Sequence, residues 1–258
     1  GPMSPKTVRN VHIVLRKALA DAERLGLVVR NAAAAAKPPV ARKRDHTTWS
    51  AEELARFLRA VEGKRLSAAF VLLATTGMRR GEALGLRWSD VDLEAGRLSI
   101  VQTITTVRDK MVITPPKTAR SRRLVSLDPE TVAALREHRR RQNEERLRAG
   151  EAWSNVGDLV FTNEVGETIH PSAFSRLFAT RVRLAKLPKI RLHDLRHTYA
   201  TVALGAGVHP KIVSERLGHA TIAVTLDLYS HVTPAIDAEA AALVARKIFT
   251  SRNAGEGE

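Results

Sequence analysis

Hydrophobic and polar positions recur with a helical period through most of the chain. In residues 4–25 apolar positions return every three or four residues, a serine and a proline suit the helix start, and a glycine follows the end. Residues 31–44 instead hold small residues, two prolines and a basic cluster, which predicts an extended linker. One helix cannot bury a core by itself, so we expect an intact domain to begin near Thr47.

The pattern after Thr47 predicts helices on both sides of a group of strands. Ser50 and Glu53 form a capping box at the first helix, and apolar residues 70–73 belong to a second. Three runs rich in Val, Ile and Thr predict antiparallel strands at 97–107, 111–114 and 122–127. The helical period then returns and predicts helices near 129–148, 171–185, 192–204, 210–217, 222–229 and 234–249. The predicted fold class is α+β, a mainly α-helical domain with a small three-stranded antiparallel sheet, preceded by one helix and a linker.

The pattern also suggests how the chain divides. Residues 1–3, Gly-Pro-Met, are typical of an expression scar, and we exclude them from the fold. We expect residues 4–46 to be the end of a truncated N-terminal module with its basic linker. Residues 47–258 are expected to form one domain.

Composition narrows the class of partner. Lys and Arg number 42 against 27 Asp and Glu, which gives a formal net charge of +15 and favours a polyanion, although a basic solvated surface is the simpler alternative. No cysteine is present, which excludes disulfides and thiolate chemistry. No apolar stretch of 18 residues and no apolar leader occurs, so we expect a cytoplasmic protein that does not bind a membrane.

Candidate chemistry gathers toward the C-terminus, at His193, Arg196, His219 and Tyr229. Tyr229 is one of two tyrosines in the chain, and two potential bases and a guanidinium precede it. A hydroxyl nucleophile, a base and a fixed cation are the groups that attack on a phosphate requires.

The segment Leu-His-Asp-Leu-Arg-His allows other interpretations. On a helix, His193, Arg196 and His197 share one face, which could simply be solvated. His193 and His197 also stand four apart, as the zinc ligands of His-Glu-x-x-His helices do. Arg196 on the same face would repel a cation, and no third ligand is obvious, so anion binding is favoured over a metal site.

Two upstream residues extend this set. Arg79 lies three residues before Glu82, close enough on a helix to be oriented by it, which makes Arg79 rather than Arg80 the fixed arginine. Taken alone, this pair is more typical of a structural ion pair. Lys117 lies in a turn-like segment between the last two strands, where a lysine is by default a surface residue but can also reach a bound ligand.

Together these motifs resemble the tyrosine recombinases of the phage integrase family. The residues that carry the resemblance are Thr-Gly-Met-Arg-Arg-Gly-Glu ending at Glu82, Lys117, His-Asp-Leu-Arg-His from His193, Leu-Gly-His ending at His219, and Tyr229. It covers roughly residues 47–232, the catalytic domain, and residues 4–46 are similar to the end of the family's core-binding domain. The resemblance does not include most of the core-binding domain or any arm-binding domain.

The resemblance implies a mechanism and a role for each residue. Arg79 and Arg196 would hold the scissile phosphate, and His193 would act as the general base for Tyr229. His219 would hydrogen-bond a phosphate oxygen, and Lys117 would protonate the leaving 5′ oxygen. Glu82 and His197 would be supporting residues. The product would be a 3′-phosphotyrosine and a free 5′-hydroxyl, with no metal and no cofactor required because the arginines and the lysine neutralise the charge.

The resemblance also implies partners. The substrate would be double-stranded DNA attachment sites of a mobile element, and the predicted DNA contacts are Arg42, Lys43, Arg44, Arg120 and Arg122. The helix at 234–249 carries an apolar stripe that would dock on a neighbouring protomer in a homotetramer, its alternative being intramolecular packing. A type IB topoisomerase-like strand transferase and a non-catalytic DNA-binding regulator are the alternative functions.

Overall fold

A computed structural model describes residues 2–40, 47–115, 122–154, 156–219 and 221–229, without the side chains of 156 and 227–229. The chain forms two compact units, residues 1–46 and residues 47–258.

The first unit contains two helices. In α1 (Pro5–Arg24) the Ser4 side chain accepts a hydrogen bond from the Thr7 backbone N–H. In α2 (Ala32–Ala35) the Asn31 side chain accepts from Ala34 N–H and donates to the Arg16 carbonyl. The extended linker predicted over residues 31–44 is therefore wrong at 32–35, because Asn31 caps a run of alanines that favours helix. The assignment of this unit to a core-binding domain stays a prediction.

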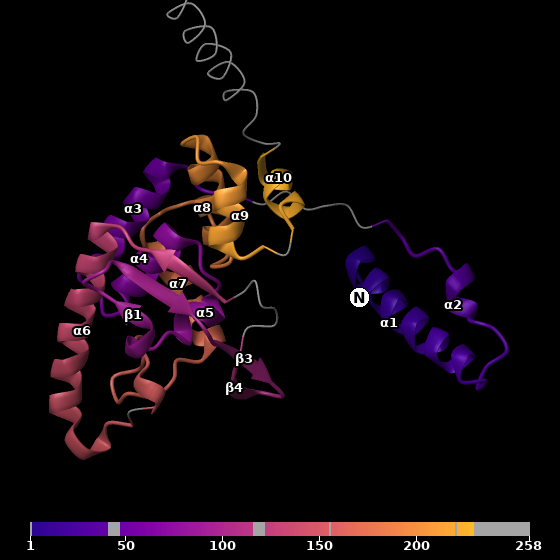
Figure 1. Ribbon diagram of the computed structural model, residues 1–258, viewed down its shortest axis with the longest axis horizontal. Coiled ribbons are helices and arrows are strands. Elements are labelled where there is room, and N and C mark those ends of the chain that lie inside the picture. The colour runs from indigo at the N-terminus through magenta and orange to yellow at the C-terminus, as the bar shows by residue number, and fades with distance from the viewer. Residues whose placement is uncertain (1, 41–46, 116–121, 155, 220, 230–258) are drawn as a thin grey trace, which may run out of the picture. The chain divides into compact units, whose positions relative to one another are not determined.

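The second unit is mainly helical. Helices α8, α9 and α10 lie together at one end of it, at the top of Figure 1, and α6 runs along its left side. Its α-helices are α3 (Ala51–Val61), α4 (Ser67–Thr76), α5 (Arg80–Leu84), α6 (Pro129–Ala149), α7 (Pro171–Leu184), α8 (Asp194–Gly205), α9 (Pro210–Leu217) and α10 (Ala223–Tyr229). Short 3₁₀ helices are η1 (Trp88–Asp90), η3 (Gly150–Ala152) and η4 (Val156–Asp158). The predicted helices occur within a few residues of their expected bounds, except that 234–249 lies outside the described residues.

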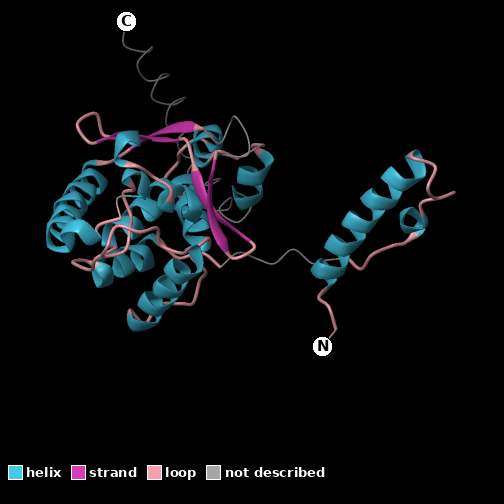
Figure 2. Cartoon of the chain, turned by 90° about the horizontal axis from the view of Figure 1, so that it is seen from below, coloured by secondary structure: helices cyan, strands magenta, loops and turns pink. Residues whose placement is uncertain are grey.

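The strands form two small antiparallel sheets, drawn as separate sets of magenta strands in Figure 2. One sheet has the order β1 (Val91–Asp92), β2 (Arg97–Ile100), β5 (Arg123–Ser126), and the other pairs β3 (Thr103–Val107) with β4 (Lys110–Thr114). The fold class, α+β with a three-stranded antiparallel sheet, is confirmed. The run predicted as one strand over 97–107 is two strands in different sheets, because the chain breaks at Gln102, whose side chain donates to the Gly85 carbonyl.

The core of the second unit is built on aromatic side chains from helices far apart in sequence. Phe57 of α3, Phe70 of α4 and Phe178 of α7 are buried, with ring centroids 5.2 to 5.9 Å apart. Trp49 joins them, and α4 is apolar around its whole circumference, as expected of a helix buried on every side. A smaller apolar cluster between α8 and α9 contains Ala200, Leu204, Val213 and Leu217. These two clusters fix α4, α8 and α9 against one another.

Among the described residues, no helix has the length and apolar character needed to cross a membrane.

Candidate active site

The site begins where α4 ends and α5 starts. Gly77 caps α4 with a left-handed backbone at φ 64°, which turns the chain toward Arg79. Glu82, in the first turn of α5, accepts hydrogen bonds from Arg79 at its backbone N–H (2.9 Å) and its Nη1 (2.8 Å). The predicted pairing of Arg79 with Glu82 is thus present, with the carboxylate buried and the guanidinium partly exposed.

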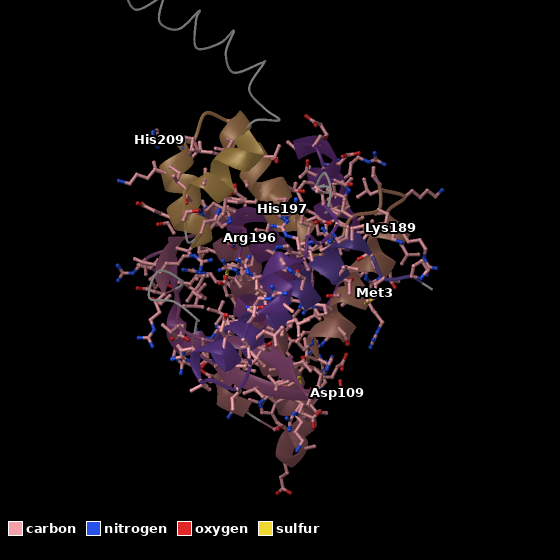
Figure 3. All side chains as sticks on the ribbon, turned by 90° about the vertical axis from the view of Figure 1, so that its right-hand side faces the viewer. Met3, Asp109, Lys189, Arg196, His197 and His209 are labelled. Atoms are coloured by element: carbon pink, nitrogen blue, oxygen red, sulfur yellow. The ribbon has the colours of Figure 1, made fainter. Side chains whose placement is uncertain are left out.

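Arg196 is the buried cation of the site. It lies in the first turn of α8 with 4% of its surface exposed, and donates to the carbonyls of Gly77 (2.8 Å) and Leu217 (2.7 Å). The alternative interpretation, in which Arg196 lies on a solvated helix face, is therefore wrong. Figure 3 shows Arg196 and the adjacent His197 toward the middle of the view, whereas Asp109 lies near its lower end.

Both carbonyls that hold Arg196 lie at the C-terminal ends of helices, α4 and α9. Such carbonyls have no partner within their helix and carry the negative end of its dipole, so they suit a guanidinium. Gly218 ends α9 in the same left-handed conformation as Gly77, at φ 65°, and its carbonyl accepts from Arg79 Nη2 at 3.1 Å. The two arginines are thus fixed by two helix ends.

The histidines occupy the rim. His193 immediately precedes α8, and its ring meets that of His197 edge to face at 5.2 Å between centroids. His219 follows Gly218, and its Nδ1 lies 2.8 Å from the Thr225 hydroxyl of α10. When this hydroxyl donates to Nδ1, the His219 Nε2 carries the proton and can donate it to an anion.

Sequence reasoning missed Arg123, the first residue of β5. Its guanidinium is buried and reaches Glu82 through Nη2 (2.9 Å) and Nη1 (3.2 Å), while its Nε donates to the Arg216 carbonyl (2.7 Å). The signal was the strand period: Val125 is buried and Leu124 exposed, so Arg123 points to the same side as Val125.

Positive charge exceeds negative charge in this cluster. Burial would raise the pKa of the Glu82 carboxyl, but the hydrogen bonds and charge of Arg123, together with the hydrogen bonds from Arg79, hold it below its usual value. Burial, helped by the nearby charge of Arg79, lowers the pKa of Arg196 to about 9, so this guanidinium is still charged at neutral pH. Arg79 and Arg123 share the Glu82 carboxylate while Arg196 donates only to carbonyls, so an anion bound among the three guanidiniums would relieve the imbalance.

The same charges keep the histidines neutral. Burial and the Arg196 charge lower the pKa of His219 to about 4, and the same two causes lower the pKa of His193. At neutral pH His193 is thus able to accept a proton. His219 can donate a hydrogen bond without adding another charge.

An open groove adjoins these residues. One cavity of about 820 Å³ is lined by Arg79, Glu82, His193 and Gly218 together with Lys189 and residues of β3. A second, of about 630 Å³, is lined by Arg123, Gly218 and His219. Arg79, Arg196, His193, His219 and Glu82 are therefore brought together from three separate segments.

Several predicted site residues cannot be placed. Lys117, Arg42, Lys43, Arg44 and Arg120 lie outside the described residues. Tyr229 ends α10, which packs on α8 and α9, but its side chain lies outside the description. Arg122 is exposed, directly before β5. The described residues contain no group of three or more metal-ligating side chains.

Comparison with known proteins places this arrangement in a family. Residues 48–235 match the model of the Phage integrase family, a span that contains every described site residue. The chain belongs to the phage integrase family. This confirms the resemblance seen in the sequence.

Curated relatives in this family come from bacteria and phages. A XerC-like tyrosine recombinase of Caldanaerobacter subterraneus is 39% identical over 198 residues, covering 72% of this chain and 51% of that protein. The ICEBs1 integrase of Bacillus subtilis is 28% identical and covers 90% of this chain and 63% of its own length. The chain thus spans about half to two thirds of these relatives.

Solved structures share the fold. The Tn1549 transposon integrase in complex with transposon right-end DNA superposes with a TM-score of 0.78 at 21% identity, covering 94% of this chain and 80% of that one. The XerA recombinase gives a TM-score of 0.60 at 24% identity, with coverage of 92% and 74%.

Proposed function

We propose that this integrase-family chain cleaves and rejoins DNA strands through a covalent 3′-phosphotyrosine, in the site-specific integration and excision of a mobile element. The observation that carries the proposal is the cluster of Arg79, Arg196 and Arg123 around one carboxylate. Its excess charge suits a phosphate diester with two non-bridging oxygens, which guanidiniums bind with paired donors. Family membership and the names of the relatives support the same activity.

In the proposed reaction the Tyr229 hydroxyl attacks the scissile phosphorus. His193 takes the hydroxyl proton, and Lys117 gives a proton to the 5′ oxygen as its bond to phosphorus breaks. Arg79, Arg196 and the Nε2 of His219 stabilise the negative charge on the non-bridging oxygens. The ester retains the bond energy, so the 5′-hydroxyl can attack in the reverse sense and rejoin a strand.

The proposed partners follow from this reaction. Double-stranded attachment-site DNA would contact Arg122 and the basic residues Arg42, Lys43, Arg44 and Arg120. Residues 234–249 would dock on a neighbouring copy in a homotetramer on paired sites. We place the protein in the cytoplasm of a bacterium, where such DNA is found.

Covalent capture tests the proposal. Nicked duplexes tiled across both ends of the DNA segment that encodes the chain are incubated with the protein, and the adduct is separated by denaturing electrophoresis. We expect wild type and Tyr199→Phe to form the adduct, and Tyr229→Phe to form none while its affinity for DNA stays within about threefold. Tyr199 is a matched control because it is the chain's other tyrosine and packs beside Leu217.

Three outcomes would count against the proposal. Capture by Tyr229→Phe would exclude Tyr229 as the nucleophile. Loss of capture in EDTA would contradict the metal-free reaction. Relaxation of a supercoiled plasmid at sites unrelated to the tiled duplexes would favour the topoisomerase alternative.

A further inference from the structure

Arg123 adds to the charge of the cluster but contacts no reacting atom in the reaction proposed above, yet it is among the most buried charged side chains of the site, with 7% of its side chain exposed. We propose that Arg123 is a positioning residue for the phosphate site: it shares the charge of Glu82, leaving Arg79 free to attract a phosphate, and it fixes the end of α9. This inference rests on the proposed function.

The Glu82 carboxylate is divided evenly between two arginines. Its Oε1 accepts from Nη1 of both Arg79 (2.8 Å) and Arg123 (3.2 Å), and its Oε2 accepts from the Arg79 backbone N–H (2.9 Å) and Arg123 Nη2 (2.9 Å). Arg123 thus forms a two-point contact with the carboxylate that Arg79 also contacts. Glu82 orients both guanidiniums and cancels neither charge completely.

Arg123 also holds the helix end that supplies the other site groups. Its Nε donates to the Arg216 carbonyl in the last turn of α9. A Cβ built on Gly218 would lie 3.0 Å from Arg123 Nη1, so the glycine is packed against this guanidinium. The carbonyls of Leu217 and Gly218, next along the chain, receive Arg196 and Arg79.

The charge of the cluster follows from these contacts. Arg79, Arg123 and Arg196 with Glu82 carry a formal charge of +2, and loss of Arg123 would reduce it to +1 while leaving Glu82 to Arg79 alone. A carboxylate paired with one arginine would weaken the attraction of that arginine for a phosphate. A role in folding alone would instead appear in the free energy of unfolding and leave the cleavage rate of the folded variant unchanged.

A double-mutant cycle tests this dependence. Single-turnover cleavage of the captured duplex is measured for wild type, Arg123→Gln, Glu82→Gln and the double variant, with enzyme in excess. We expect Arg123→Gln to lower the cleavage rate about 100-fold, with the DNA dissociation constant changed less than about threefold. Adding Glu82→Gln should restore about tenfold of the lost rate, because it returns the cluster to +2.

The controls separate the possible failures. Arg97→Gln removes an exposed arginine that pairs with Asp92 in the same sheet, and should cleave within about twofold of wild type. A double variant as slow as Arg123→Gln or slower would overturn the inference while leaving the proposed function intact. No adduct from wild type on any duplex would instead refute the proposed function.

A conservative variant covers the case in which Arg123→Gln does not fold. Arg123→Lys keeps the charge but cannot span both Glu82 and the Arg216 carbonyl, so we expect cleavage within about tenfold of wild type. If Arg123→Lys folds, as judged by its melting curve, yet cleaves about 100-fold more slowly, charge sharing is not the role of Arg123.

Discussion

Two buried polar networks lie in the second unit, and they differ in charge balance. One network lies along α6, where Arg65 donates to both oxygens of Glu145 at 2.7 Å and to the Thr162 carbonyl. In the same network Gln142 accepts from the Trp88 indole N–H and donates to the Leu159 carbonyl. Burial lowers the pKa of the neighbouring His138, which contacts the Val160 carbonyl and is neutral at pH 7. We call this the scaffold network.

The site network of Arg79, Glu82, Arg123 and Arg196 has three cations and one anion. In the scaffold network the Arg65 charge is balanced by Glu145, and the exposed Glu164 carboxylate lies a further 3.7 Å from Arg65 Nε, so no positive charge is left over. A balanced network stabilises the fold, whereas an unbalanced one retains charge for a ligand. Charge balance therefore distinguishes the two networks better than burial does, since each of them includes partly exposed side chains.

The substitution with the largest expected effect tests whether Arg196 contributes to cleavage or to stability. Arg196→Met should lower single-turnover cleavage by at least about 10³-fold, since in the proposed reaction it removes a buried donor to the phosphate. Its free energy of unfolding should fall by no more than about 1 kcal/mol, because the substitution also removes a cation buried beside other cations. Chemical denaturation and covalent capture measure the two quantities. A loss of stability of several kcal/mol with cleavage intact would make Arg196 a scaffold residue.

We expect Gly77, a left-handed glycine at the site, to tolerate substitution less well than Gly63, a left-handed glycine remote from the site. A Cβ at Gly77 would lie 2.4 Å from Leu217 Cδ2 and 2.7 Å from the Tyr199 ring, whereas Gly63 at φ 71° has open space around it. We expect Gly77→Ala to destabilise the protein by about 3 kcal/mol and Gly63→Ala by about 1 kcal/mol, measured by urea denaturation. Equal losses would show that backbone strain, rather than contact between α4, α8 and α9, determines both.

For the scaffold network we expect the opposite of the result for Arg196→Met, namely a loss of stability with little change in cleavage. Arg65→Met leaves Glu145 without its two-point partner, and because both side chains are partly exposed the expected cost is about 2 kcal/mol in unfolding free energy. Single-turnover cleavage at a temperature well below the melting point should change less than about twofold. A larger fall in cleavage than in stability would remove the distinction between the networks.

The smallest effect concerns pH. The pKa of His219 is about 4 in the folded protein, below the usual value of about 6.5 expected when unfolded. Between these values the unfolded state binds a proton that the folded state does not, so stability falls as pH is lowered from about 6.5 toward 4. His219→Asn should therefore lose less in melting temperature than wild type between pH 7 and pH 4.5. Parallel curves would contradict the lowered pKa.

Local pattern was sufficient to predict the parts of the fold that depend on neighbouring residues. The capping box at Ser50, the proline starts of α6, α7 and α9, and the pairing of Arg79 with Glu82 three residues later all follow from short-range chemistry. Strand membership did not, because no local signal tells which residues of 97–107 pair with β5 and which with β4. Arg123 was missed for a related reason. The strand period places Arg123 on the same side as the buried Val125, but only tertiary contacts determine that it meets Glu82.

The start of the second unit is hydrogen-bonded to the segment that contains His193 and Arg196. The Trp49 backbone N–H donates to the Thr198 hydroxyl at 3.1 Å, and its indole N–H donates to the Pro188 carbonyl at 2.9 Å. Thr198 and Pro188 lie on either side of His193 and Arg196 in the sequence. Tension on the chain at residue 48 would thus reach this segment directly. For protein engineering, a fusion joint belongs before Trp49, because a joint after it would detach both anchors.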